Sequence, residues 1–214
     1  MPVAMTATVV LILTLTAVIA VADWLAVAGS RRGLEYAAKP LTIVGLIVAV
    51  LAYDTDQHLV RGLVVAALAL SLLGDVLLML PGDLFVPGLA AFLLAHVAYV
   101  VAMFVLGALS GGLLIGLAGV AIAGAVLGVP IVRGAIRQDS SLQVPVLAYL
   151  VVISLMVATA GGTGVAVVLA GALLFYASDA LLGWSRFVAD FGRSRVAVMI
   201  TYHLGQALLA LGLL

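Results

Sequence analysis

The chain contains no cysteine, and only three of its 214 residues are histidines. The absence of cysteine excludes disulfide bonds, thiolate-ligated metals and a cysteine nucleophile. His58, His96 and His203 are too few and too scattered to predict a histidine-based metal site. We therefore expect neither a metal nor an organic cofactor.

Charged residues are also scarce. Only 8% of the residues are charged and 66% are hydrophobic, whereas ordinary soluble domains carry roughly 25% charged residues. Nine basic and nine acidic side chains give a formal net charge of zero, so no basic surface for nucleic acid is expected. Because so few charges cannot cover a water-exposed surface, we expect an integral membrane protein.

The first apolar segment lacks the basic residues of a secretion signal. Ala20-Val21-Ala22 before Asp23 fits a small-x-small cleavage site. However, residues 1–8 carry no positive charge, and the apolar run is longer than that of a typical signal. We predict that this helix is retained.

Long apolar runs fill most of the sequence. A membrane-spanning helix needs roughly 20 predominantly apolar residues, and charges, prolines and Gly/Ser clusters divide the chain into segments near that length. Because the connections are short, we expect a single domain over residues 1–214, an all-α polytopic bundle of about eight transmembrane helices. The predicted spans are 5–28, 38–53, 60–80, 84–107, 112–130, 144–160, 164–184 and 194–214.

Arginine is distributed unevenly between the two sides of this predicted bundle. The loops after the even-numbered spans contain only Arg61. Cytoplasmic loops are enriched in Lys and Arg, so we expect the odd-numbered loops in the cytoplasm and both termini on the non-cytoplasmic side. The arginines of the odd-numbered loops are Arg31, Arg32, Arg133, Arg137, Arg186 and Arg193, with Arg195 at the edge.

Two aspartates, Asp75 and Asp179, interrupt the third and seventh predicted spans. An ionisable group inside a span is costly unless it is paired or solvated, and is therefore a candidate functional residue. Each lies five or six residues before the cytoplasmic end of its span. At about 1.5 Å per residue, both lie roughly 8 Å inside that boundary. Their shared depth favours a common site over two separate structural roles.

Other polar side chains are predicted near the same layer, and together they indicate a pocket that opens toward the cytoplasmic side. They are Lys39, which opens the second span with Pro40 in its first turn; His96 and Tyr99, which form an inward stripe with Phe92 on the fourth; and Tyr202 and Gln206, one turn apart on the last. We expect His96 to lie deeper than the others, nearer the middle of the membrane.

Each of these residues also has a structural interpretation. Polar groups can fasten helices together, and the long side chain of Lys39 can extend to the membrane surface. Asp23 lies close enough to the boundary to reach lipid headgroups, which favours a structural role for it.

Two nearby buried carboxyls suit acid–base chemistry, because one of them tends to keep its proton beside the other's negative charge. The sequence lacks the G-x-S-x-G elbow of serine hydrolases and the H-E-x-x-H zinc motif. Acid-catalysed cleavage through an oxocarbenium-like state is therefore one interpretation. A proton-coupled transporter is the alternative, although no clear inverted repeat supports it. A structural subunit without chemistry is a third.

Several short motifs then occur in a specific order. They are Lys39-Pro40, Gly74-Asp75-Val76-Leu77-Leu78-Met79, Phe92 with His96 and Tyr99, Gly171-Ala172-Leu173-Leu174-Phe175-Tyr176-Ala177-Ser178-Asp179, Arg186-Phe187, and Thr201-Tyr202 followed by Gln206. In this order and spacing they resemble the YhhN/TMEM86 family of lysoplasmalogenases. The resemblance runs from about residue 35 to the C-terminus, and Asp23 and His203 have no counterpart in it.

The resemblance implies hydrolysis of the vinyl-ether bond of lysoplasmalogens to a fatty aldehyde and glycerophosphoethanolamine or glycerophosphocholine. Our hypothesis is that one of Asp75 and Asp179 donates the proton, that the other stabilises the cation and orients water, and that Lys39 holds the headgroup phosphate. The remaining substrate-binding residues that we expect are His96, Tyr99, Ser178, Tyr202 and Gln206. The expected partners are the lysophospholipid substrate and membrane lipids. Short loops and abundant Ala, Val and Leu are typical of a prokaryotic protein, so we expect the bacterial cytoplasmic membrane.

Overall fold

All regular structure in the described part of the chain is helical. The computed structural model describes residues 5–108 and 111–214. The π-helical segment η1 (Gly124–Gly128) joins α5 to α6, and the short 3-10 helix η2 (Ser140–Leu142) precedes α7. The α-helices are α1 (Ala7–Ala28), α2 (Arg32–Ala52), α3 (His58–Met79), α4 (Phe85–Val105), α5 (Gly112–Ala123), α6 (Val129–Gln138), α7 (Gln143–Gly162), α8 (Ala166–Phe187) and α9 (Ser194–Gly212).

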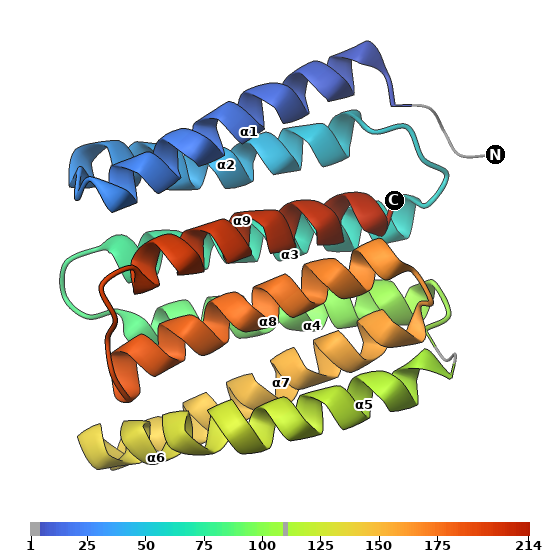
Figure 1. Cartoon of the computed structure of the whole chain (residues 1–214). Coiled ribbons are helices and arrows are strands. Elements are labelled where there is room, and N and C mark those ends of the chain that lie inside the picture. The colour runs from blue at the N-terminus through green and yellow to red at the C-terminus, as the bar shows by residue number, and fades with distance from the viewer. Residues whose placement is uncertain (1–4, 109–110) are drawn as a thin grey trace.

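Seven helical stretches within the described residues are long and apolar enough to cross a membrane, and α5–η1–α6 forms one of them. The eighth stretch, α9, has 19 residues and is less apolar because it carries Tyr202, His203 and Gln206. The expected all-α membrane bundle is confirmed. Both the start of α1 and the C-terminus lie at one end of the bundle, as an even number of spans requires (Figure 1).

Two predicted boundaries were wrong. The second helix begins at Arg32 rather than at residue 38, because Glu35 is paired with Arg195 and does not interrupt the helix. Lys39 consequently lies two turns inside α2, and Pro40 lies in the helix interior rather than in its first turn. Proline has no N–H to donate to the carbonyl four residues earlier, so the carbonyl of Tyr36 loses its usual helical partner.

The fifth predicted span was too short. The helix does not end at residue 130 but continues through the π-helical segment to Gln138. Arg133 and Arg137 therefore lie on α6 rather than in a loop. This end of the bundle still contains the α1–α2, α3–α4, α6–α7 and α8–α9 connections (Figure 1).

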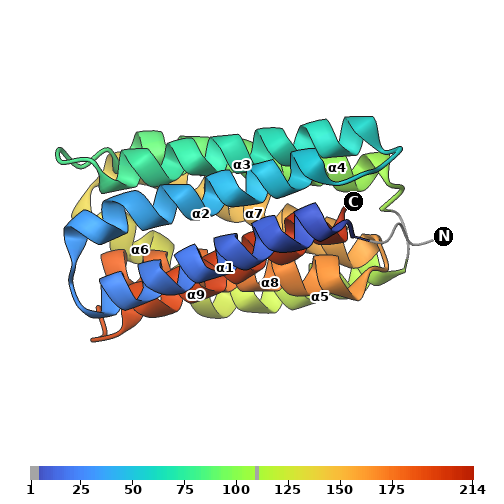
Figure 2. The same ribbon diagram turned by 90° about the horizontal axis from the view of Figure 1, so that it is seen from above.

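The helices form a closed ring in which each one packs on its neighbours. The order of contacts is α1, α2, α3, α4, α7, α8 and α9, and α9 returns to α1, while the α5–α6 stretch packs against α7 and α8. Figures 1 and 2 show that these helices run nearly alongside one another. The ring brings α3 and α8, which are far apart in sequence, to opposite walls of one interior.

Helices α8 and α9 approach most closely where two glycines face each other's backbones. A Cβ atom on Gly205 would lie 2.8 Å from the backbone nitrogen of Phe175, and one on Gly171 would lie 2.7 Å from that of Leu209. Small residues allow such approaches between membrane helices, which are held by van der Waals contact rather than by a hydrophobic driving force. This crossing fixes the position of Tyr202 relative to Asp179.

Candidate active site

The carboxylate of Asp75 is bound by two side chains from two other helices. The ammonium Nζ of Lys39 on α2 lies 2.9 Å from Oδ1, and the hydroxyl of Tyr202 on α9 donates to Oδ2 at 2.7 Å. Asp75 is 1% exposed. A buried negative charge is tolerable when it is paired and hydrogen-bonded, so these two contacts compensate a negative charge on Asp75.

The residue before Asp75 allows α4 to pack against α3. A Cβ on Gly74 would lie 2.5 Å from the ring of Phe92, so glycine leaves the space that this ring occupies. The Phe92 ring meets that of Tyr202 edge-on at a centroid distance of 5.8 Å. Phe92 thereby supports the tyrosine that binds Asp75.

Asp179 on α8 lies in a different environment. The hydroxyl of Tyr149 on α7 donates to its Oδ2 at 2.5 Å, and Nε2 of His96 on α4 lies 3.6 Å from the same oxygen. No Lys or Arg within the described residues forms an ion pair with it. Asp75 is thus paired with an amino group, whereas Asp179 has a phenol hydroxyl and an imidazole as its polar neighbours.

Both carboxyl groups line one polar cavity of about 440 Å³. Most of its wall comes from α2, α3, α8 and α9, with Val27 of α1 and Phe92 of α4 completing it. The cavity reaches the surface at the exposed residues Arg32 and Arg195. These residues lie at the end of the bundle that contains the α1–α2 and α8–α9 loops (Figure 1).

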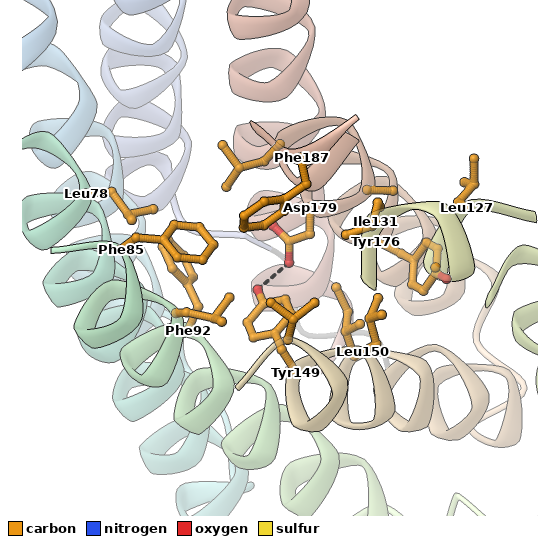
Figure 3. A pocket seen from close by; sticks show the side chains of 17 residues that line it. Leu78, Phe85, Phe92, Leu127, Ile131, Tyr149, Leu150, Tyr176, Asp179 and Phe187 are labelled. Atoms are coloured by element: carbon orange, nitrogen blue, oxygen red, sulfur yellow. Dashed lines mark hydrogen bonds between the residues drawn. The ribbon is translucent and has the colours of Figure 1, made fainter. Parts of the chain in front are cut away.

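A second, apolar pocket of about 50 Å³ adjoins this cavity. It lies between α4, α6, α7 and α8, and Figure 3 shows Tyr149 and Asp179 bonded within a lining that includes Phe85, Phe187 and Leu150. We call it the apolar groove. The residues shared by cavity and groove are Leu78, Phe92, Asp179 and Leu182. Asp179 therefore lies at the junction between a polar and an apolar compartment.

The structure brings five of the predicted site residues to the wall of the polar cavity: Lys39, Asp75, Ser178, Asp179 and Tyr202. The hydroxyl of Ser178 donates to the carbonyl of Val198 at 3.1 Å. Lys39 is 6% exposed and pairs with Asp75 rather than extending to the membrane surface.

The other three predicted site residues are fully buried outside the lining of this cavity. Tyr99 donates to Oε1 of Gln206 at 2.7 Å, and His96 packs against the rings of Phe175 and Tyr149. The predicted inward stripe of Phe92, His96 and Tyr99 on α4 is confirmed, because all three are buried.

Sequence reasoning missed Tyr149, because a single tyrosine in an apolar span carries no motif. It also missed the ion pair between Glu35 and Arg195, which are 160 residues apart. Asp23 is completely buried, and its carboxylate oxygens have no hydrogen-bond partner among the described residues, so it does not reach lipid headgroups. Within the described residues, no cluster of three or more His, Asp or Glu side chains is arranged to hold a metal ion.

Comparisons with known proteins find relatives of this chain. The chain is 34% identical over 152 residues to a human protein named Lysoplasmalogenase TMEM86B, an alignment that covers 69% of this chain and 62% of the human protein. It is 32% identical over 186 residues to a Mycobacterium bovis protein named Lysoplasmalogenase, covering 84% of this chain and 70% of that protein. No solved structure matches the chain.

The sequence profile of the YhhN family matches residues 34–213. This range contains Lys39, both site aspartates and the last helix, but not α1. The chain belongs to the YhhN family.

Proposed function

We propose that this protein is a lysoplasmalogenase, which hydrolyses the vinyl-ether bond of a lysophospholipid in the bacterial cytoplasmic membrane. The observation that supports it most directly is the pair of carboxyls in contrasting environments, on a polar cavity that continues into an apolar groove. The names of the human and mycobacterial relatives point to the same reaction.

The two compartments match the two ends of a lysoplasmalogen. The glycerol and its phosphate occupy the polar cavity, and the first carbons of the alkenyl chain enter the apolar groove. Because the groove holds only about 50 Å³, the rest of the chain lies beyond it, against lipid. The vinyl-ether bond joins the polar and apolar parts of the substrate, which places it beside Asp179.

Asp179 is the general acid in this proposal. A carboxyl without a cation partner in an apolar setting is more stable neutral than charged. Tyr149 donates to one of its oxygens, which leaves the other to carry the proton. Transfer of that proton to the vinyl carbon farther from the ether oxygen gives an oxocarbenium ion and leaves Asp179 as a carboxylate beside it.

Asp75 is the residue that receives the proton of the attacking water. Lys39 and Tyr202 keep it ionised and fixed. Water adds to the carbon bonded to the ether oxygen and gives a hemiacetal, which collapses to the aldehyde and the free glycerol hydroxyl. At the hemiacetal stage Asp179 has lost one proton and Asp75 has gained one. During the collapse, Asp75 gives its proton to the departing glycerol oxygen and Asp179 takes the proton of the hemiacetal hydroxyl, which restores both carboxyls for the next turnover.

The remaining site residues position these groups. Ser178 lines the cavity next to Asp179, and His96 borders the same carboxyl from α4. Tyr99 and Gln206 form a buried bond behind Tyr202 on α9. The site faces the arginine-rich end of the bundle, which we assign to the cytoplasm, with both termini on the opposite side.

The test is aldehyde release from lysoplasmalogen by the purified protein and by Asp75→Asn and Asp179→Asn. Asp56→Asn is the matched control, since Asp56 is exposed in the α2–α3 loop at the opposite end. We expect wild type and the control to release aldehyde, and both site variants to lose at least about 100-fold in kcat, the usual contribution of a positioned acid or base.

The corresponding saturated ether lipid should not be cleaved, because it has no double bond to protonate. Aldehyde release that survives both site exchanges would leave a hydrolase without this mechanism. No release from folded wild type with any headgroup would contradict the proposed function and favour a proton-coupled transporter.

A further inference from the structure

Three charged side chains lie at the mouth of the polar cavity, away from the two aspartates. They are Arg32 and Glu35 near the start of α2 and Arg195 near the start of α9. Both carboxylate oxygens of Glu35 accept from Nη2 of Arg195, at 2.6 and 2.8 Å. The side chain of Glu35 is 10% exposed and that of Arg195 is 57% exposed, so the cluster joins the cavity to the surface.

The guanidinium groups retain unused donors. Both recorded bonds of Arg195 come from Nη2, and Nη1 and Nε make none with the described residues. The guanidinium of Arg32 likewise has no ion pair or hydrogen bond within that part of the chain. An arginine presents five N–H donors in a planar fork, and such forks bind phosphate oxygens in pairs.

Charge balance in the cavity favours one additional anion. Lys39 neutralises Asp75, and Glu35 neutralises Arg195 in part. With Asp179 neutral, the wall carries three cations and two carboxylates. The single negative charge of a phosphodiester completes this balance, and the amine of a zwitterionic headgroup then lies toward the surface, at the exposed ring of Tyr36.

The spacing of Arg32, Glu35 and Lys39 along α2 also indicates which end of the bound lipid lies at the mouth of the cavity. Glu35 is one turn from Lys39, and Arg32 is nearly a further turn away, so the three lie within about 10 Å along the helix. The reacting bond lies at the floor beside Asp75 and Asp179, and the mouth lies where the headgroup of the same lipid must be.

We infer that the mouth is a binding site for a zwitterionic phosphodiester headgroup. Arg32 and Arg195 bind the phosphate, and Glu35 holds Arg195 in place and attracts the amine. Tyr36, which also lines the cavity, provides an aromatic face of the kind that recognises quaternary ammonium groups. Lys39 is left to hold Asp75. The inference rests on the proposed function for the identity of the lipid, but the binding site itself is testable without hydrolysis.

The experiment measures binding of uncleavable saturated-ether lysolipids to the full chain in detergent. The headgroups are phosphoethanolamine, phosphocholine, phosphate alone and none, the last being the alkylglycerol. Variants are Arg32→Gln, Arg195→Gln and Glu35→Gln. Arg31→Gln is the matched control, because Arg31 is exposed and does not line the cavity.

We expect each cavity arginine variant to weaken binding of the three phosphate-containing lipids about 10-fold, the effect of losing one charge-assisted contact. Binding of the alkylglycerol should not change. Glu35→Gln should weaken the two amine-bearing lipids relative to the lipid with phosphate alone, and the control should match wild type.

Equal loss of affinity for all four lipids, or no loss for any, would overturn the headgroup site. Arg32→Gln keeps this test decisive even if a Glu35 or Arg195 variant unfolds, because the guanidinium of Arg32 has no partner among the described residues to lose. Aldehyde release by wild type is measured in parallel. Binding that depends on the arginines without aldehyde release would refute the proposed function and leave the headgroup site standing.

Discussion

Removing the ammonium of Lys39 should destabilise the bundle more than removing the whole ion pair. The side chains of Lys39 and Asp75 are 8% and 2% exposed and lie 2.9 Å apart. Lys39→Met keeps most of the side-chain volume but leaves a buried carboxylate with only the hydroxyl of Tyr202 as partner. Breaking a buried pair in this way costs about 3–5 kcal/mol.

Replacing both partners by neutral residues removes the charge that needs compensation. We expect the free energy of unfolding of the double variant, Lys39→Met with Asp75→Asn, to lie within about 1 kcal/mol of the wild-type value. Replacing both members of a buried ion pair by uncharged residues often changes stability very little. For a chain of this length, the single change should lower Tm by about 10 °C and the double change by only a few degrees.

The assay is thermal unfolding of the purified protein in one detergent, with wild type, both single variants and the double variant as a cycle. Additive effects would refute this reasoning: the stability lost by the double variant would then equal the sum of the losses in the two single variants. Additivity would mean that the two side chains stabilise the bundle independently and that the ion pair is not the reason for their burial.

Three further predictions address other parts of the structure. Tyr149→Phe removes the hydroxyl that orients the proposed acid. We expect kcat to fall about 10-fold, which corresponds to about 1.4 kcal/mol in the activation free energy, and KM to stay unchanged. A change in KM alone would indicate that Tyr149 acts in substrate binding. Gly205→Leu should lower the free energy of unfolding by about 1–3 kcal/mol or more, because a Cβ at this position collides with the backbone of α8. Gly62→Leu should leave the thermal unfolding unchanged, because a Cβ there has no neighbour within 4 Å. A single cysteine at Arg193→Cys should resist a membrane-impermeant thiol reagent added to intact cells, and one at Asp56→Cys should react; the reverse pattern would invert the proposed orientation.

Much of the fold followed from local composition. Apolar runs of bilayer length predict membrane helices because the backbone must satisfy its own hydrogen bonds in lipid, and this holds whatever the helices pack against. The predicted start of the second helix was wrong because a tertiary contact outweighed the local signal. Glu35 was expected to lie outside the second span, but its partner Arg195 on α9 allows the helix to include it.

The sequence predicted which ionisable residues belong to the site, but it did not predict which side chains pair with one another. Asp75 and Asp179 stand out because a carboxyl in an apolar span is costly and therefore rare. Nothing in the sequence indicates that Lys39 binds Asp75, or that Tyr149 binds Asp179. Such contacts depend on the order of helices around the ring and on the rotation of each helix, which are set by packing across the interior.

The sequence by itself determined that this protein is a membrane bundle with aspartates inside two of its spans, because hydropathy and the cost of a charge act on each helix separately. Only the tertiary structure decided that the two carboxyls differ. Asp75 faces an ammonium and Asp179 faces a tyrosine and a histidine, because the charge state of a buried group depends on the few side chains that the fold brings within reach.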